Sequence, residues 1–500
     1  MATTLPFEQS RAAKVLGHLR RPWPALLVLA VVTVLSRFPG VLWNGMFDRD
    51  EAYLSVTGDV IGSGGDLYHQ VIDRKPPIVP FVYAAIRELS VDMRWIRLAV
   101  SVLIFVNGII VMAIARRLGV SKHLATLTGA LAIAGTALFL PADGQAANFE
   151  LWGLAPASLA IYCALRTRQS SRPEWWFALA AFSAIIAANC KQPYVVVLFV
   201  VLFEAFRNSQ RSRALMATAV SASLTFIFFW AIFGNAYLRW TWIENGDYVD
   251  GGVSMLRALG VGTGLTIVFA LLHLPLFYGV WAAIVKRVRI DATIVVWLVV
   301  SAAVIPIGFR FFGHYYQQLV PVLAVMTGIA LTTASRNTVR SVIALTALLL
   351  ASMITLSVVY RPDLSNFTSV GRRVQALTQP TDRIYVWGAL PDVYVAAQRL
   401  PAGSFLHGGY LTGNWASRQS DLANIDLTEE PFRSRWQMFS ADMQNNPPAV
   451  IVDGARLGTD WASAQMWRYP IGDFLSRCYQ LDSDIDRLPI WVLDRAKCGK

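Results

Sequence analysis

The chain has 500 residues, of which 55% are hydrophobic and only 15% are charged. Soluble domains carry about 25% charged residues, so this composition indicates a protein that lies largely in a lipid bilayer, where charge is costly. The net charge of +12 does not indicate a nucleic-acid-binding protein: residues 361–500 hold 15 basic and 15 acidic residues, and the excess lies in short clusters between apolar runs.

The apolar runs of the first 360 residues predict about eleven membrane-spanning helices, since one span needs about 20 apolar residues. They cover residues 22–43, 97–115, 124–140, 151–165, 175–190, 194–206, 214–234, 261–284, 292–308, 316–334 and 341–360. Basic clusters flank residues 175–206 on both sides, so we expect a helical hairpin there that turns at Lys191–Gln192–Pro193.

Basic clusters in every second loop predict the orientation of the chain. They lie at Arg11/Lys14/Arg20/Arg21, Arg116/Arg117/Lys122, Arg166/Arg168/Arg172, Arg207/Arg211/Arg213, Lys286/Arg287/Arg289 and Arg336/Arg340. The positive-inside rule makes these loops cytoplasmic, together with the N-terminal segment 1–21. The loops 44–96, 141–150, 235–258 and 309–315 are then outside, as is everything after Tyr360.

The outer segments differ in character. The loop 44–96 contains helical pattern at 51–61 and 76–89, so we expect it to be ordered on the membrane surface. In residues 361–500, extended segments at 383–387, 449–452 and 490–493 each follow helical pattern, at 370–377, 432–443 and 471–479. The predicted fold is therefore an all-α polytopic membrane domain at 22–360, followed by a small extracytoplasmic α/β domain at 361–500.

The four cysteines are too few to predict a disulfide framework. Cys163 and Cys190 lie in apolar runs and are expected to be buried packing residues. Cys478 and Cys498 lie in the C-terminal segment, where an oxidising exterior would allow them to pair.

The acidic motif Phe47-Asp48-Arg49-Asp50-Glu51 is the strongest candidate for chemistry, because it places three carboxylates just after the first span. Transfer to a hydroxyl needs a base that takes the acceptor proton, and Asp48, Asp50 and Glu51 are candidates. The competing interpretation is structural: Asp48 or Asp50 caps a helix that begins near Glu51.

Cations and hydrogen-bond donors follow on the same predicted face. Arg74 and Lys75 precede Pro76-Pro77, and Arg310, His314 and Tyr315 open a later span. They suit an anionic lipid phosphate, although an ordinary helix start and an interfacial aromatic belt explain the same patterns. Three weaker candidates are Lys191, Gln192 and Glu150, whose alternative is an ordinary place at the headgroups.

The order of these motifs resembles the GT-C superfamily of integral membrane glycosyltransferases. The motifs are the acidic pair Asp50-Glu51, Lys75-Pro76-Pro77, a span ending in Arg116-Arg117-Leu118-Gly119 and the late His314-Tyr315. The resemblance is to the branch that holds the protein O-mannosyltransferases and the aminoarabinose transferase of lipid A. It covers roughly residues 25–335.

The resemblance implies a polyprenyl-phosphate sugar donor in the membrane and an acceptor hydroxyl on the outer face. It implies Asp50 as the base, and Lys75 and His314-Tyr315 as the groups that hold the donor. Asp48 departs from the pattern of that branch, which leaves open which aspartate is the base. It also leaves open a divalent metal at Asp48 and Asp50. No other cofactor is expected.

We therefore expect an inverting transfer in the cytoplasmic (plasma) membrane to a glycan, lipid or protein of the cell envelope. Asp50 would deprotonate the acceptor, while Lys75, Arg310 and His314 neutralise the leaving phosphate. A transporter or lipid flippase is an alternative, although it would place ionisable residues near the bilayer midplane. A non-catalytic protein of cell-envelope assembly is the second alternative.

Overall fold

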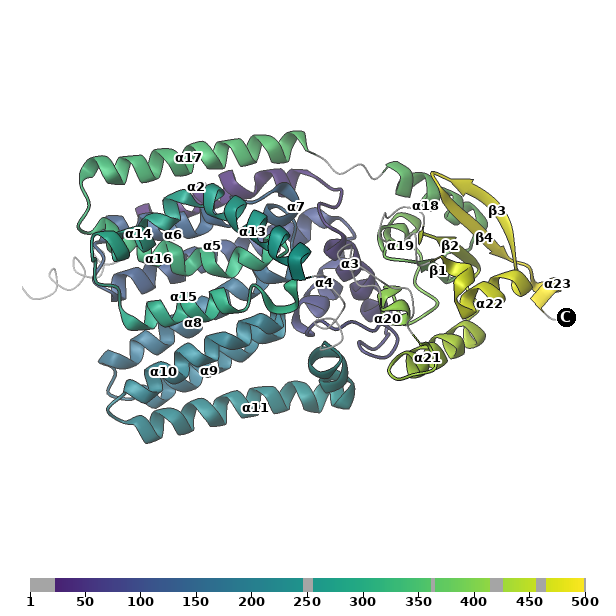
Figure 1. Cartoon of the computed structure of the whole chain (residues 1–500), viewed down its shortest axis with the longest axis horizontal. Coiled ribbons are helices and arrows are strands. Elements are labelled where there is room, and N and C mark those ends of the chain that lie inside the picture. Colours follow the sequence, from purple (N-terminus) through teal and green to yellow (C-terminus); the bar gives the residue numbers. More distant parts are fainter. Residues whose placement is uncertain (1–22, 246–254, 361–364, 414–425, 456–464, 499–500) are drawn as a thin grey trace, which may run out of the picture.

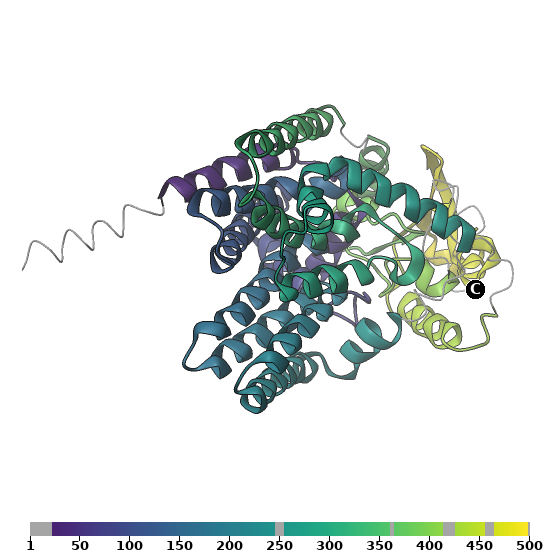
Figure 2. The same ribbon diagram turned by 60° about the vertical axis from the view of Figure 1, so that its left-hand side comes forward.

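The computed structural model describes residues 23–245, 255–360, 365–413, 426–455 and 465–498. The predicted cytoplasmic segment 1–21 lies outside these residues. Most of the described chain is helical, and a small sheet is confined to the C-terminal part (Figure 1). The helical bundle and the sheet lie at opposite ends of the molecule, and a 60° turn shows the same arrangement (Figure 2).

Long apolar helices form the bundle, at the places where the apolar runs predict them. They are α2 (Trp23–Leu42), α5 (Met93–Arg117), α6 (Lys122–Gly135), α8 (Phe149–Arg166), α9 (Pro173–Cys190), α10 (Val197–Arg207), α11 (Arg211–Tyr237), α13 (Met255–Leu272), α14 (Leu274–Val285), α15 (Ala292–Ala303), α16 (Leu319–Leu331) and α17 (Arg336–Val359). Shorter elements join them: α7 (Pro141–Gly144), η1 (Thr167–Gln169), η2 (Gln192–Val196), η3 (Leu238–Ile243), η4 (Ile307–Phe309) and η5 (Gly313–Gln318).

Four helices, α2, α5, α11 with η3, and α17, are each long and apolar enough to cross a membrane alone, within the described residues. A fifth candidate is the pair α13 and α14, which meets at an angle of 93°. The protein is thus a multi-pass membrane protein, while the count of about eleven crossings stays a prediction. The predicted hairpin at 175–206 is present as α9 and α10, with the turn at Lys191.

The first outer loop is ordered, as its pattern predicts. It forms α3 (Arg49–Gly62) and α4 (Ile78–Leu89). Figure 1 places both helices between the bundle and the C-terminal part. The segment between them forms an isolated β-bridge from Ile72 to Phe405 of the C-terminal part.

The C-terminal part contains a four-stranded sheet in the order β1-β2-β4-β3, built from β1 (Ile384–Trp387), β2 (Val450–Asp453), β3 (Tyr479–Ile485) and β4 (Leu488–Leu493). β1 and β2 are parallel, and β4 runs antiparallel to both of its neighbours. The helices are α18 (Ser365–Leu377), α19 (Asp392–Ala397), α20 (Gly409–Thr412), α21 (Phe432–Asn445), α22 (Pro470–Cys478) and α23 (Arg495–Cys498).

Three of the four strands match the predicted extended segments. β3 was not predicted, because it is an edge strand whose sequence, Tyr479-Gln-Leu-Asp-Ser-Asp-Ile485, is mostly polar and exposed. Its pairing with β4, from which it is separated by two residues, supplies the stability that its sequence does not signal.

One hydrophobic core joins the first outer loop to the C-terminal part. Val56 and Val60 of α3 and Tyr68 are buried in the same cluster as Val386 of β1 and Val452 of β2. The C-terminal part therefore positions the loop that carries the acidic motif, as well as being attached to it. Cys478 and Cys498 form a disulfide, while Cys163 and Cys190 are buried and free.

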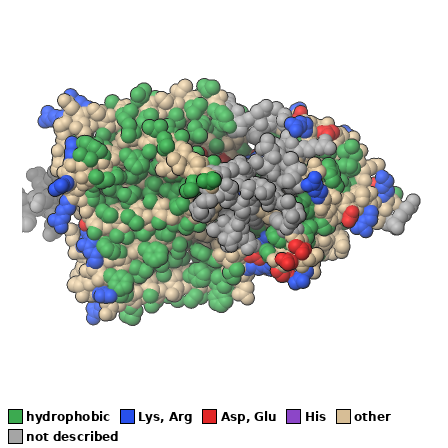
Figure 3. Space-filling model, in the orientation of Figure 1, with side chains coloured by type: hydrophobic (Ala, Val, Ile, Leu, Met, Phe, Trp, Pro, Cys, Tyr) green, Lys and Arg blue, Asp and Glu red, His purple; other side chains and the backbone are tan. Residues whose placement is uncertain are grey.

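The surface of the bundle is largely hydrophobic (Figure 3). Lys and Arg side chains gather at its far end, away from the C-terminal part. The connections from α10 to α11 and from α16 to α17 lie at that end (Figure 1). This distribution matches the alternation of basic loops in the sequence.

Candidate active site

The acidic motif forms the first turn of α3. Asp48 is the N-cap, and its Oδ1 accepts a hydrogen bond of 2.7 Å from the backbone N–H of Asp50. Asp50 and Glu51 follow in the first turn, where the helix dipole favours carboxylates. The capping interpretation of the motif is therefore correct for Asp48, and Asp50 is free of this task.

Glu51 is fully buried and paired with Arg97. Its Oε1 and Oε2 accept hydrogen bonds of 2.9 and 2.6 Å from the Arg97 guanidinium. The backbone N–H groups of Phe47 and Ala147 donate to the same carboxylate, at 2.9 and 2.8 Å. The Glu51 carboxylate thereby holds the loop, α5 and residue 147 together, which favours a structural role over the expected catalytic one.

Asp50 and Lys75 approach each other across the first outer loop. The Lys75 ammonium lies 3.6 Å from Oδ2 of Asp50, and the two side chains are 12% and 26% exposed. Asp50 is therefore a partly open carboxylate beside a cation.

Hydrogen bonds to the backbone fix the segment that carries Lys75. Tyr68 donates to the Lys75 carbonyl at 2.9 Å, and Gln192 donates to the Arg74 carbonyl at 2.6 Å. Tyr410 of the C-terminal part accepts from the Arg74 N–H at 2.8 Å. Gln192 thus has a positioning role that its sequence context did not show.

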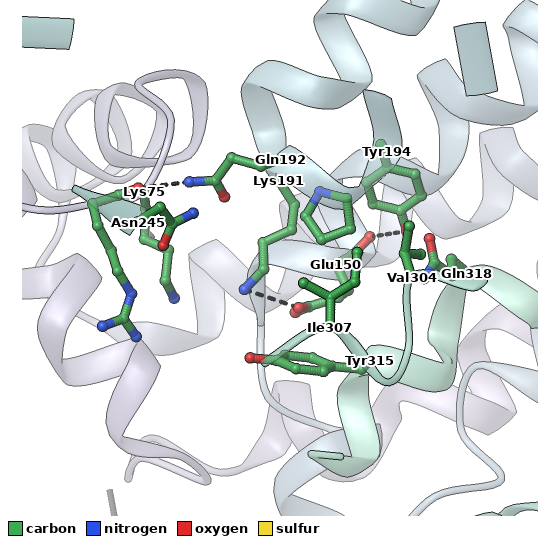
Figure 4. A pocket seen from close by; sticks show the side chains of 12 residues that line it. Lys75, Glu150, Lys191, Gln192, Tyr194, Asn245, Val304, Ile307, Tyr315 and Gln318 are labelled. Carbon is green, nitrogen blue, oxygen red and sulfur yellow. Dashed lines mark hydrogen bonds and ion pairs between the residues drawn. The ribbon is translucent and has the colours of Figure 1, made fainter. Parts of the chain in front are cut away.

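A second lysine enters the same space from the turn between α9 and η2. Lys191 forms an ion pair of 3.0 Å with Glu150, the second residue of α8. The Lys75 and Lys191 ammonium groups lie 4.1 and 5.2 Å from the centre of the Phe149 ring, so both cations contact one aromatic side chain. The Tyr315 ring also lies near Lys191 (Figure 4), with its centre 5.4 Å from the ammonium group.

These side chains line one cavity, shown in Figure 4. Its walls are Arg74, Lys75, Glu150, Lys191, Gln192, Pro193, Tyr194, Asn245, Val304, Ile307, Tyr315 and Gln318. Cations and amides form one side, and the apolar Val304 and Ile307 lie next to the end of α15. Such a cavity suits a ligand that joins a phosphate to an apolar chain.

His314 and Arg310 lie near this cavity without lining it, as far as the described residues show. His314 is buried, and both its backbone N–H and its Nδ1 contact Oδ1 of Asp143, at 2.9 and 3.0 Å. Arg310 is fully buried. The expectation that both contact the donor phosphate stays a prediction.

Burial and neighbouring charges shift the pKa values of Asp48 and Asp50 in opposite directions. Burial opposes ionisation of Asp50, but Lys75, His314 and Lys191 hold the pKa of its carboxyl below the usual range. Burial and the charge of Asp50 raise the pKa of Asp48 to about 7. Asp50 is therefore the carboxylate that stays ionised at neutral pH.

The pKa values of Lys75 and His314 are shifted in opposite directions. Burial lowers the pKa of Lys75, and Asp50 only partly offsets this effect. Burial also opposes the charged form of His314, but Glu150 and Asp143 raise its pKa to about 9. His314 is therefore an imidazolium at neutral pH and adds positive charge behind the cavity.

A divalent metal needs several oxygen ligands, and the residues at this site do not supply them. Asp48 caps its helix and Asp50 faces Lys75. Throughout the described ranges, no three His, Cys, Asp or Glu side chains gather closely enough to hold an ion. A metal bridging Asp48 and Asp50 finds no support in this geometry.

Sequence reasoning missed Asp143, Arg97 and Asn245. Asp143 lies in the predicted outer loop 141–150 beside Glu150, so the gathering of carboxylates there was its signal. Arg97 opens an apolar run, where an arginine marks either an interface or a buried partner. Asn245 carries no local signal, because only the return of the chain after η3 brings it to the cavity.

Comparison with known proteins gives one family match. The dolichyl-phosphate-mannose-protein mannosyltransferase family (PMT_2) matches residues 74–233, which include Lys75, Glu150 and Lys191. Comparison with curated protein sequences found no match.

Solved structures match over nearly the whole chain. ArnT from Cupriavidus metallidurans bound to undecaprenyl phosphate has a TM-score of 0.58 at 15% identity, over 96% of this chain and 100% of that one. The Archaeoglobus fulgidus oligosaccharyltransferase tethered to an acceptor peptide has a TM-score of 0.53 at 11% identity, and the match covers 92% of this chain and 72% of that one. The mycobacterial arabinofuranosyltransferase AftD has a TM-score of 0.52 at 13% identity, and the match covers 94% of this chain and 40% of AftD. The chain thus has the GT-C fold of these membrane proteins, which confirms the resemblance carried by its motifs.

Proposed function

We propose that this protein transfers a sugar from a polyprenyl-phosphate donor to an acceptor hydroxyl. The observation that carries the proposal is the Asp50–Lys75 pair at 3.6 Å, beside a cavity where Lys75 and Lys191 stand next to apolar walls. The mannosyltransferase family match supports it. So does the shared fold with ArnT, which was solved with undecaprenyl phosphate, and with an archaeal oligosaccharyltransferase solved with a dolichol-phosphate.

The transfer follows from the roles that the geometry permits. The acceptor oxygen attacks C1 of the sugar while the C1–oxygen bond to the phosphate breaks, and the bonding electrons leave with the phosphate. Lys75 and Lys191 neutralise the charge that develops on this leaving group, and His314 adds to their field. The acceptor proton passes to Asp50, so the product is an inverted glycoside, a polyprenyl phosphate and a protonated Asp50.

A base whose pKa is held low is adequate for this reaction. A phosphate monoester is already a good leaving group, so most of the barrier is lowered by the cations. Asp50 needs only to be ionised and to receive the proton late, as the acceptor oxygen loses its basicity. The residues behind the cavity, Glu51 with Arg97 and Arg310, would position this apparatus without touching substrate.

The active face is proposed to lie outside the cytoplasmic (plasma) membrane. Its support is the Cys478–Cys498 disulfide, which suits an oxidising compartment, and the cluster of Lys and Arg at the opposite end of the bundle (Figure 3). Ser209, in the α10–α11 connection, and Asn445, at the end of α21, are both exposed and lie on opposite sides in this topology.

Thiol labelling tests this orientation. Single cysteines at Ser209 and Asn445, in a background without Cys163 and Cys190, are treated with an impermeant maleimide in whole cells. Labelling of the Asn445→Cys variant alone is expected. Labelling of Ser209→Cys in intact cells would reverse the topology. Lysed cells provide the control that both positions are reactive.

Transfer itself is tested with the purified protein in liposomes made from envelope lipid extract. A panel of radiolabelled polyprenyl-phosphate sugars is supplied, and the label is expected to move to a new product with one of them. Asp50→Asn is the matched inactive control. Uptake of labelled lipid across the liposome without a new product would favour a flippase, and binding without turnover would favour an assembly protein.

A further inference from the structure

A second polar cavity lies between the first outer loop and the C-terminal part, apart from the lysine cavity. It has a volume of about 580 Å³, within the range of about 300–1,000 Å³ that is common for ligand sites. Asn44–Met46 and Asp59 form one side, and Asp392, Gln398 and Arg399 form the other. The mechanism proposed above uses none of these residues.

Asp392 points to a ligand in this cavity. Its side chain is 6% exposed, and its Oδ2 accepts no hydrogen bond from the described residues. A buried carboxylate oxygen without a donor is costly, so such an atom normally meets a partner from outside. The hydroxyl groups of a sugar are donors of the required kind.

The charges around the cavity balance. Asp59 forms a two-pronged ion pair with Arg87, with both distances at 2.7 Å, and Arg399 lines the cavity together with Asp392. The lining therefore holds two acids and two bases, unlike the lysine cavity. Mixed donors and acceptors without excess charge suit an uncharged, hydroxyl-rich head group and do not suit a phosphate.

An apolar groove adjoins this cavity along the same two segments of chain. It has a volume of about 300 Å³ and is lined mainly by Val34, Phe38 and Leu42 of α2 and by Leu98 and Val102 of α5. Both helices are long and apolar enough to cross the membrane. The groove ends at Leu42, and the polar cavity begins two residues later at Asn44.

One wall of the polar cavity comes shortly before α3 in the chain. Asn44–Met46 line the cavity, and the Asp48 cap and the turn that carries Asp50 follow within four residues of Met46. Asp59 lies nine residues after Asp50, and at about 100° per residue it faces the opposite side of the helix. A ligand head in this cavity would therefore reach Asp50 around the N-terminal end of α3, past Arg49, and not through the helix.

From these relationships we infer that the polar cavity and the α2–α5 groove together bind the acceptor, and that the acceptor is a glycolipid. Its apolar chain lies in the groove and its sugar head contacts Asp392. This inference rests on the proposed transferase function. It places donor and acceptor on opposite sides of α3, with Asp50 between them at the first turn.

Photo-crosslinking in native membranes tests the occupant. A benzophenone side chain replaces Thr368 in the polar cavity, Val102 in the groove, or Leu224 on the bilayer-facing surface of α11 as control. One lipid with a sugar head is expected at both Thr368 and Val102, enriched over Leu224. Bulk lipids alone at Val102, or a protein or free glycan at Thr368, would overturn the inference.

Kinetics separates this inference from the proposed function. Asp392→Asn is expected to raise the acceptor KM roughly ten-fold, while the donor KM and slow donor hydrolysis without acceptor stay unchanged. Gln398→Ala gives a milder second test if Asp392→Asn folds poorly, and exposed Glu88→Gln is the charge-matched control. Normal acceptor KM in both variants would refute the acceptor site, whereas absence of donor turnover in the wild type would refute the function itself.

Discussion

Asp50 and Lys75 lie 25 positions apart in one loop, and their charged groups meet at 3.6 Å beside the cavity that Lys75 shares with Lys191. Two devices bring them together. The Asp48 cap starts α3 so that Asp50 falls in its first turn, and hydrogen bonds from Tyr68 and Gln192 hold the backbone before Pro76. The proposed base and the proposed phosphate-binding cation are thereby held beside each other before substrate arrives, which is the form of preorganisation that lowers a charge-separating barrier.

Asp50→Asn is expected to reduce turnover by roughly two or more decades, the scale of general-base catalysis, while donor binding survives. Asp48→Asn is the matched control: asparagine caps a helix as well as aspartate does, so this variant should fold normally and lose little activity. Turnover of a lipid-linked sugar and donor affinity are measured for both. Equal loss in the two variants would mean that Asp50 has no special role.

Breaking the Glu51–Arg97 pair is expected to destabilise the protein. Both side chains are fully buried, so Glu51→Gln leaves an uncompensated guanidinium and should cost about 3–5 kcal/mol. The double variant Glu51→Gln/Arg97→Gln should lose less than Glu51→Gln alone. Thermal unfolding in detergent measures the effect. A stable Glu51→Gln protein that has lost all turnover would instead restore a catalytic role to Glu51.

The sequence was informative where a pattern is local. The capping motif, Lys75 before Pro76-Pro77 and the hairpin turn at Lys191 could all be placed from short segments. The burial and pairing of Glu51 could not be predicted in this way, because its partner Arg97 is 46 residues away and neither residue signals burial by itself. The position of Arg310 before a span did not indicate that its side chain is fully buried, because burial depends on packing from distant parts of the chain.

The pH dependence of kcat/KM should show a fall at alkaline pH. His314 has a pKa raised to about 9, so its positive charge is present below that pH and is lost as the pH rises through it. Loss of this charge weakens the field on the leaving phosphate and on Asp50. His314→Gln should lower activity at pH 7 and flatten the fall in activity near pH 9. An unchanged fall would exclude His314 as its source.

Lys75 and Lys191 are expected to act on one phosphate. Lys75→Ala and Lys191→Ala should each reduce kcat/KM by tens- to hundreds-fold, about 2–4 kcal/mol in transition-state stabilisation. The double variant should lose less than the sum, because groups that share one ligand are coupled. Lys286→Ala, on an exposed connection at the far end of the bundle, is the control for loss of a lysine.

The pairing of Lys191 with Glu150 complicates a simple deletion, since Lys191→Ala leaves a buried carboxylate without its cation. The cycle is therefore run in a Glu150→Gln background, where both lysines remain but no acid is stranded when Lys191 is removed. Protein amounts in the membrane are matched before donor turnover is compared. If the two losses add fully in this background, the lysines bind different groups, and the cavity drawn between them is not the donor phosphate site.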